Sequence, residues 1–174
     1  LGYAEDVFLA VAVGANTSRP SRKGFYDLFR AFYLFDRSIP PVDAAHRPIL
    51  HVHAVSSGVF GGEDLRMVAE TAGLDAARLR FSPQYDLVTG QIGQDYLAQL
   101  YGAADVYVSA SHGEGFGVPI AEAAACGIPQ VVPDNSSQPE VSCFRQIVPC
   151  TPYMHIEGTT WGRPDADKMA DALT

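Results

Sequence analysis

The stretch VYVSASHGEGFGVPIAEAAACGIPQVV, residues 106–132, decides the fold of this chain. It opens with a short apolar run rich in β-branched residues, which is typical of a buried parallel strand. Three glycines alternate through residues 113–117, where the backbone can turn sharply and approach a ligand closely. Pro119 suits the first turn of a helix, and Cys126-Gly127 ends that helix before the next strand. Because free N–H groups and the helix dipole point the same way at such a loop, the stretch predicts an anion-binding site.

The rest of the chain repeats this alternation of strand and helix. Apolar runs predict strands, and apolar residues spaced three and four apart predict amphipathic helices. Such an alternation forms a parallel sheet with right-handed crossovers, in which ligands bind outside the carboxyl ends of the strands. The predicted fold is therefore α/β, a Rossmann-like parallel sheet flanked by helices. The predicted strands are residues 7–13, 49–55, 79–81, 106–110, a run after Pro129, and 146–148; the predicted helices are 25–32, 65–72, 97–104, 119–126 and 165–173.

A basic loop follows the first predicted strand. Gly14 ends that strand, and the loop that comes next concentrates Arg19, Arg22 and Lys23. Since the carboxyl ends of parallel strands meet at one edge of a sheet, this loop and the glycine-rich loop are expected at the same edge. Two interpretations are open: the cluster binds an anion, or it is a solvated basic loop at the start of a helix.

The glycine-rich stretch resembles the donor-binding signature of retaining glycosyltransferases of the two-domain GT-B architecture, particularly glycosyltransferase family 4, the group 1 transferases. Glu114 and Glu122 have the Glu-x7-Glu spacing of that family. The embedded positions that also match are Gly115, Phe116, Gly117, Pro119, Ala123, Gly127 and Pro129. The resemblance implies that residues 1–174 are the donor-binding C-terminal half of such an enzyme, a fragment without the N-terminal acceptor domain and the end of the last helix.

The basic loop extends the resemblance. Gly14 and Lys23 match a glycine and a lysine of the family, and the family's lysine binds the donor diphosphate. The family's usual arginine after the glycine is absent, because Ala-Asn stands at positions 15–16. Arg19 or Arg22 is left as its substitute.

The resemblance also implies roles for the two carboxylates. Glu122 would bind the ribose hydroxyls of the nucleotide, although a helix-favouring residue on an exposed face gives the same pattern. Glu114 would lie beside the donor sugar, where it either orients the sugar or also stabilises positive charge at the anomeric carbon. His112, next to the signature, either lines the donor site or contacts solvent. The predicted catalytic residue is Glu114, and the predicted donor-binding residues are Gly14, Arg19, Arg22, Lys23, His112, Gly115, Phe116, Gly117, Val118 and Glu122.

Several other polar residues and one cysteine are predicted to be structural. His51 and His53 share a strand face, but no third ligand follows at a telling spacing, so packing is favoured over a metal site. Asp165 opens the last helix as a cap rather than as part of a metal-binding Asp-x-Asp. No metal is therefore expected. The turn 134–137 lacks the glycines of the family, so its serines are expected only to cap the turn, and Cys126 is expected in the core.

Composition limits the function and the compartment. A length of 174 residues corresponds to one domain, and a net charge of −8 argues against a nucleic-acid surface. No apolar run is long enough to span a bilayer. Three cysteines without CxxC spacing favour reduced thiols in the cytoplasm. We therefore expect a cytoplasmic protein, either free or peripheral at the inner face of the membrane, with no cofactor beyond its nucleotide-diphosphate sugar substrate.

These observations lead to one hypothesis and three alternatives. The hypothesis is a retaining glycosyltransferase that transfers a hexose from a nucleotide-diphosphate sugar to an acceptor hydroxyl, with the isolated domain inactive. The alternatives are a GT-B sugar-nucleotide epimerase, a non-catalytic module that binds nucleotide sugars, and a generic Rossmann domain that binds NAD. The sugar, the base, the acceptor and the oligomeric state stay open.

Overall fold

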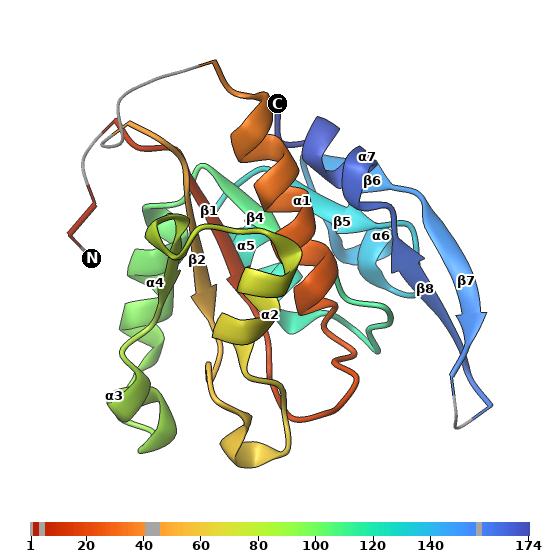
Figure 1. Ribbon diagram of the computed structural model, residues 1–174, viewed down its shortest axis with the longest axis horizontal. Coiled ribbons are helices and arrows are strands. Elements are labelled where there is room, and N and C mark those ends of the chain that lie inside the picture. Colours follow the sequence, from red (N-terminus) through yellow and green to blue (C-terminus); the bar gives the residue numbers. More distant parts are fainter. Residues whose placement is uncertain (1, 4–5, 41–45, 156–157) are drawn as a thin grey trace.

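A parallel β-sheet forms the centre of the protein (Figure 1). The computed structural model describes residues 2–3, 6–40, 46–155 and 158–174. Six strands pair in the order β3-β2-β1-β4-β5-β6, and every neighbouring pair is parallel. The predicted α/β, Rossmann-like fold class is thereby confirmed. The strands are β1 (Leu9–Val13), β2 (Ile49–His53), β3 (Leu79–Phe81), β4 (Val106–Val108), β5 (Gln130–Pro133) and β6 (Arg145–Val148).

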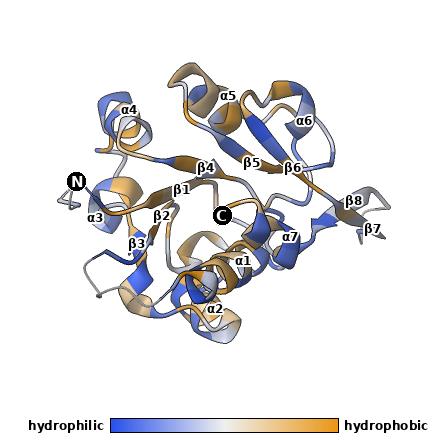
Figure 2. Ribbon diagram, turned by 90° about the horizontal axis from the view of Figure 1, so that it is seen from above, coloured by the Kyte–Doolittle hydropathy of each residue, from blue (hydrophilic) through white to orange (hydrophobic). Residues whose placement is uncertain are grey.

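Helices cover both faces of the sheet. Figure 2 shows α1, α2 and α7 on one side and α4, α5 and α6 on the other. No helix in the described part of the chain is long and apolar enough to cross a membrane. The α-helices are α1 (Phe25–Ser38), α2 (Leu65–Ala72), α3 (Gln84–Val88), α4 (Gln94–Gly102), α5 (Val118–Ala125), α6 (Gln138–Val141) and α7 (Ala166–Asp171), and the 3-10 helices are η1 (Gly58–Phe60) and η2 (Ala76–Arg78).

The side chains of β1 alternate between two apolar cores, because successive residues of a strand point to opposite faces. Ala10 and Ala12 belong to the core that contains the buried side of α1. Their small side chains leave room for aromatic rings from that helix. Leu9 and Val11 belong to the core beneath α4 and α5. The phenylalanines of α1 in the first core are Phe25, Phe29, Phe32 and Phe35.

The predicted elements exist, and most of the differences lie at their ends. The strand predicted at 7–13 begins at Leu9, where pairing with Ile49 of β2 starts. The strand predicted at 49–55 ends at His53. The helix predicted at 97–104 covers Gln94–Gly102 instead. Strand and helix ends are set by pairing and capping, which the apolar pattern marks only approximately.

An antiparallel hairpin near the end of the chain was not predicted from the sequence. Its strands are β7 (Cys150–Met154) and β8 (Thr160–Pro164), and they form a separate two-stranded sheet. The hairpin extends away from the body of the domain at the right of Figure 1. No residue of β7 is buried, half of the residues of the two strands are exposed and Pro152 lies within β7, so the alternating pattern of a half-buried strand is absent.

The prediction that Cys126 lies in the core was wrong, because this residue is exposed. The buried stripe of α5 contains Ile120 and Ala123, and the helix ends at Ala125. Gly127 then takes the left-handed conformation, with a φ of 74°, and turns the chain toward β5. Cys126 thus lies at the end of the helix, past the point where the stripe meets the sheet.

Candidate functional site

Two loops meet at the carboxyl edge of the sheet. One follows β1 and the other follows β4, and these strands are neighbours. The backbone N–H of His112 donates to the carbonyl of Arg22 at 2.8 Å, and the Ser111 hydroxyl donates to the same carbonyl at 3.3 Å. Residues almost ninety positions apart in the sequence are therefore fixed against one another at the place where α/β sheets bind ligands.

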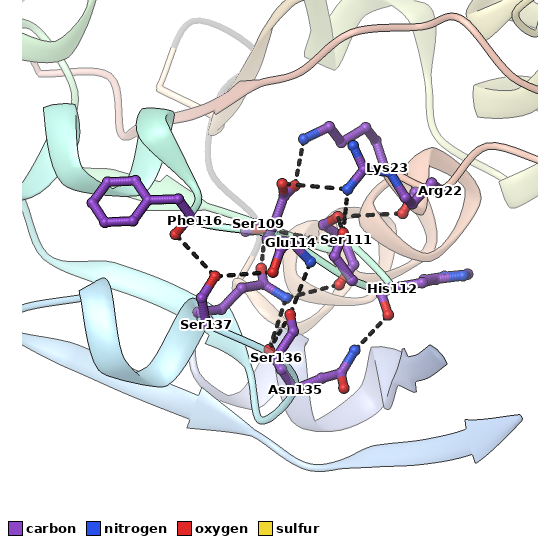
Figure 3. A network of polar contacts seen from close by, with 12 residues as sticks. Arg22, Lys23, Ser109, Ser111, His112, Glu114, Phe116, Asn135, Ser136 and Ser137 are labelled. Carbon is purple, nitrogen blue, oxygen red and sulfur yellow. Dashed lines mark hydrogen bonds and ion pairs between the residues drawn. The ribbon is translucent and has the colours of Figure 1, made fainter. Parts of the chain in front are cut away.

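Glu114 is held between two cations at this junction (Figure 3). Its Oε1 accepts a hydrogen bond from the ammonium of Lys23, and its Oε2 lies 3.3 Å from Nη1 of Arg22. The side chain of Glu114 is 11% exposed and that of Arg22 is 39% exposed. Burial alone would raise the pKa of Glu114, but the hydrogen bond and charge of Lys23, together with Arg22, hold that pKa below its ordinary value. Glu114 is therefore an ionised carboxylate at neutral pH.

The structure separates the two arginines that the sequence left as candidates. Arg22 lies beside Glu114 and also donates to the carbonyl of Gly113. Arg19 instead donates to the carbonyl of Gly62, in the loop that precedes α2. Of the two, Arg22 is thus placed to contact an anion that also contacts Lys23.

A cavity of about 400 Å³ opens beside Lys23. Its walls come from the loops after β1 and β2, together with Leu87 of α3 and Pro119 of α5. Gly14 forms part of the wall, and a Cβ there would lie 3.3 Å from Cγ of Lys23. The glycine therefore lets the lysine side chain lie across the loop. Its position beside two cations makes the cavity suited to a ligand with a negatively charged group.

Asn16 stands where the resemblance led us to look for an arginine, and it has a structural role. Its side-chain amide donates to the carbonyls of Val55 at 2.9 Å and Glu63 at 2.7 Å, and its carbonyl accepts from the N–H of Glu63 at 2.9 Å. Asn16 is buried and ties the loop after β2 to the loop after β1. It therefore shapes the cavity wall without carrying charge.

The turn 134–137 is hydrogen-bonded to the glycine-rich loop, a contact that the sequence did not predict. Ser136 Oγ accepts from the N–H of Glu114 at 2.8 Å, while Ser137 Oγ donates to the carbonyls of Glu114 and Phe116 at 3.0 and 2.9 Å. The expectation that these serines only cap a turn was wrong, because each hydroxyl reaches across to the other loop (Figure 3). The available signal was their position directly after β5, at the same edge of the sheet.

Glu122 lies on α5, next to Tyr101 of α4. It is half-buried, and its Oε2 accepts a hydrogen bond of 3.0 Å from the hydroxyl of Tyr101 in α4. Burial, followed by the nearby Tyr107 and Glu122, raises the pKa of Tyr101, so this hydroxyl stays protonated and donates. The cavity beside Lys23 is lined by Pro119 of the same helix, but Glu122 is outside the described lining. Tyr101 lies within the helix predicted at 97–104, but no pattern in the sequence indicated its contact with Glu122.

The imidazole of His112 points away from Glu114 (Figure 3). Its Nε2 lies 2.8 Å from Oδ2 of Asp27, and its Nδ1 lies 2.7 Å from the hydroxyl of Tyr153. These residues, with Arg163, border a second cavity of about 440 Å³ between α1 and the hairpin. The lining of this cavity combines Arg163 with two carboxylates, Asp27 and Glu63, whereas Lys23 and Arg22 outnumber the carboxylate of Glu114, so the cavity beside Lys23 suits an anion better.

The residues considered as metal ligands are packed or used as caps. His51 Nε2 and His53 Nδ1 lie 3.0 and 2.8 Å from the hydroxyl of Ser82, and burial lowers the pKa of His51 to about 4. Asp165 accepts hydrogen bonds from the N–H groups of Asp167 and Lys168, which makes it the N-cap of α7. In the described part of the chain, no group of three or more His, Cys, Asp or Glu side chains could hold a metal ion.

Comparison with known proteins gives this geometry a context. Over 52 residues, which are 30% of this chain and 14% of the relative, the chain is 46% identical to O-antigen chain mannosyltransferase B from Escherichia coli. Sucrose-phosphate synthase from Thermosynechococcus elongatus is similar in structure, with a TM-score of 0.69 and 25% identity over 98% of this chain and 36% of that chain. A trehalose-6-phosphate structure from Escherichia coli bound with UDP-2-fluoro glucose has a TM-score of 0.65 and 16% identity, over 97% and 36% of the two chains.

These relatives are much longer than the chain, which spans 36% of either of the two structures. The family model described as glycosyl transferases group 1 matches residues 10–173, nearly the whole chain. The match includes both loops of the candidate site. The chain therefore belongs to the group 1 glycosyl transferases.

Proposed function

We propose that this chain is the donor-binding, C-terminal domain of a retaining glycosyltransferase. The enzyme transfers a hexose from a nucleotide-diphosphate sugar to an acceptor hydroxyl. The observation that supports the proposal most is the meeting of Lys23, Arg22 and Glu114 beside a cavity at the carboxyl edge of the sheet. Two cations suit the charged diphosphate of such a donor, and a carboxylate suits the hydroxyls of its uncharged sugar.

In this proposal Lys23 and Arg22 bind the diphosphate, with the N–H groups of Phe116, Gly117 and Val118 at the start of α5. The bond from the anomeric carbon to the diphosphate oxygen breaks, and its electron pair leaves with the diphosphate. The acceptor oxygen then bonds to the anomeric carbon and its proton passes to the departing phosphate. Donors that are already in place for the developing negative charge supply a large share of catalysis. The protein's own cations neutralise the diphosphate, so we expect no metal cofactor.

Glu114 has a different role from the cations. The donor diphosphate competes with Glu114 for Lys23, and binding therefore frees Glu114 to face the sugar. There the carboxylate accepts hydrogen bonds from sugar hydroxyls and stabilises positive charge at the anomeric carbon. Glu122 binds the ribose: Tyr101 occupies its Oε2, and its Oε1 accepts a hydrogen bond from a ribose hydroxyl.

The proposed partner of this domain is the N-terminal domain of the full-length protein, which supplies the acceptor contacts and closes the cleft. Large apolar side chains are exposed near the candidate site, as the other domain would require. Phe60 and Phe116 are 52% and 59% exposed, on the loops that follow β2 and β4. We place the protein in the cytoplasm, either free or peripheral at the inner face of the membrane.

The test begins with binding. The full-length protein is titrated with GDP, UDP, ADP and NAD, and the titration is repeated with Lys23→Ala and Glu122→Ala. We expect saturable binding of one nucleoside diphosphate, weakened in both variants, and transfer of hexose from the matching sugar donor. Binding of NAD alone would overturn the proposal. An epimerised donor would identify an epimerase, and binding without turnover would identify a non-catalytic module.

A further inference from the structure

A group of polar side chains around the buried Asp27 lies on the far side of His112 from Glu114. Asp27 is its centre: Oδ2 contacts His112 Nε2 at 2.8 Å, and Oδ1 accepts from Nε and Nη2 of Arg163 at 2.8 and 2.7 Å. The hydroxyl of Tyr153 lies 2.7 Å from the other imidazole nitrogen. We call these four residues the Asp27 network. The side chain of Asp27 is only 6% exposed, so its charge depends on these partners.

The Asp27 network joins three parts of the chain that are distant in sequence. Asp27 belongs to the first turn of α1, His112 to the loop after β4, and the other two residues to the hairpin. In the hairpin register, Thr151 faces Arg163 and Tyr153 faces Trp161, so Tyr153 and Arg163 lie on the same face. The hairpin therefore presents Tyr153 to His112 and Arg163 to Asp27 from the same face.

The main chain of His112 is held as firmly as its side chain. The carbonyl of His112 accepts from the N–H of Gly162 in β8 at 3.0 Å and also from the side-chain amide of Asn135. Its N–H donates to Arg22 at 2.8 Å. A side chain at position 162 would meet Asn135, since a Cβ there would come 2.8 Å from its Cγ. All four hydrogen-bonding groups of His112 are thus engaged, only two residues before Glu114.

We propose that the Asp27 network is a positioning device by which the β7–β8 hairpin sets the Glu114 loop. The hairpin fixes His112 through Tyr153, Arg163 and Gly162, and His112 in turn fixes the backbone that presents Glu114 and the N–H groups after it. This inference rests on the proposed function, because that function gives the loop its task. His112 is then a positioning residue that acts through Glu114 and does not contact the donor.

The packing of the hairpin favours this role over general stabilisation. Among the described residues, neither of the two apolar cores contains a side chain from β7 or β8. Trp161 lies against the loop instead, since a Cβ at Gly113 would be 3.8 Å from its Cδ1. The hairpin contacts the loop through Tyr153, Trp161 and Gly162, and it contacts α1 through Arg163. Because it adds no side chain to either core, its loss is expected to loosen the loop more than the domain.

The first experiment measures loop order without any ligand. Hydrogen exchange is followed by mass spectrometry in the full-length protein, for wild type, Tyr153→Phe and Arg163→Ala. We expect peptides that cover residues 111–117 to exchange about tenfold faster in Arg163→Ala and less so in Tyr153→Phe, with β1 and β2 unchanged. Arg145→Ala, which removes the same charge from β6, and Met154→Ala, which changes an exposed hairpin residue, are the matched controls. Unchanged exchange at residues 111–117 in folded Arg163→Ala would overturn the inference.

The second experiment asks whether the loosened loop affects catalysis. Transfer is measured for His112→Ala, His112→Gln and Arg163→Ala in the full-length protein. We expect kcat to fall about tenfold with a smaller change in the donor KM, in variants that stay folded at the assay temperature, and His112→Gln to recover part of the loss because its amide can still donate to Asp27. Equal losses in His112→Gln and His112→Ala, accompanied by a lower Tm, would contradict a positioning role. Faster exchange in a protein whose wild type transfers no sugar would refute the proposed function and leave the hairpin contact standing.

Discussion

Asp27 and Glu114 are two carboxylates in similar surroundings with different access. Each is mostly buried, with side chains 6% and 11% exposed, and each contacts two basic side chains. Burial acts to raise the pKa of both, and in both the hydrogen bonds and charges of the partners lower it below the ordinary value. Ion pairing alone would therefore give no reason to assign them different roles.

The partners of the two carboxylates make the difference. At Asp27 both ring nitrogens of His112 are engaged and Arg163 donates to the carboxylate through two of its nitrogens, so the charge of Asp27 is matched by one permanent cation. Lys23 carries three N–H donors, of which the structure uses one for Glu114, and Arg22 is 39% exposed beside an open cavity. An incoming anion can thus reach the cations of Glu114 without breaking the fold. Ion pairing thus stabilises the fold at Asp27, whereas at Glu114 it leaves cations that a ligand can contact.

The largest expected effect separates the two carboxylates by stability. Asp27→Ala leaves the mostly buried imidazole of His112 without its acceptor and removes the link between α1 and the hairpin, and we expect it to lower the free energy of unfolding by about 3 kcal/mol. Glu114→Ala should change it by less than about 1 kcal/mol, because Arg22 is 39% exposed and Lys23 lines the cavity, so both cations can reach water. Urea unfolding of the two variants, followed by circular dichroism, gives the comparison. Equal losses would mean that Glu114 is as structural as Asp27.

Lowering the pH should also compare the two carboxylates, once the contribution of buried His51 to the stability has been measured. The pKa of buried His51 is lowered from an ordinary 6.5 to about 4, chiefly by burial. The unfolded state therefore binds a proton more readily, and stability present above pH 6.5 is lost as the pH falls toward 4, by roughly 2–3 kcal/mol. The two carboxylates have lowered pKa values, so their contribution is lost only at still lower pH. Unfolding of wild type and His51→Gln between pH 7 and 4 measures this, and a slope retained in His51→Gln would assign it elsewhere.

Nucleotide affinity should change in opposite directions for the two sides of the Lys23–Glu114 pair. Lys23→Ala removes a charged hydrogen bond to the diphosphate and should weaken binding by about 1.5–3 kcal/mol, or roughly 10- to 150-fold. Glu114→Gln keeps the shape of the side chain but releases Lys23, so diphosphate binding should tighten while transfer falls. Calorimetric titration of the full-length protein tests both, with Arg19→Ala as the control of equal charge. Weaker binding in Glu114→Gln would argue against competition for Lys23.

The fold was readable from the sequence because its signals are local and repeated. β-branched runs, the spacing of Phe25, Phe29 and Phe32, and the glycines after β4 each mark an element without knowledge of the rest. The hairpin gave no such signal, since its strands are exposed and are stabilised by contacts with distant residues. Its partner Asp27 reads in the sequence as an ordinary acidic residue in the first turn of a helix.

Those residues of the site that belong to a sequence motif could be predicted. The sequence predicted that the loops after β1 and β4 share an edge, and the structure brings Lys23, Arg22 and Glu114 together there. The choice of Arg22 over Arg19, the serines of the turn 134–137 and the direction of His112 depend on side-chain contacts between distant segments. No spacing of residues in the sequence indicates those contacts, so they could not be predicted from it.

The smallest expected effect concerns Tyr101, a residue that only the structure connects to the site. Tyr101→Phe removes the hydrogen bond to Glu122 Oε2 while keeping the buried ring, and the released carboxylate has more freedom to turn away from the ribose. A neutral donor to a carboxylate in a half-buried position contributes about 1 kcal/mol, so nucleotide affinity should fall roughly fivefold. Tyr107→Phe is the matched control, because its ring packs against Tyr101 at 6.2 Å and its hydroxyl has no described bond to Glu122.

The double variant decides how the effect of Tyr101 arises. If Tyr101 acts only by holding Glu122, then Tyr101→Phe should have no further effect on affinity in a protein that already carries Glu122→Ala. If the two losses add, Tyr101 acts on the ligand or on α5 by another route, and the interpretation of its hydroxyl as a support for Glu122 is wrong. The cycle thus tests whether Glu122 of α5 depends on a buried neighbour that never contacts the ligand. The hairpin variants ask the same question of the loop that carries Glu114.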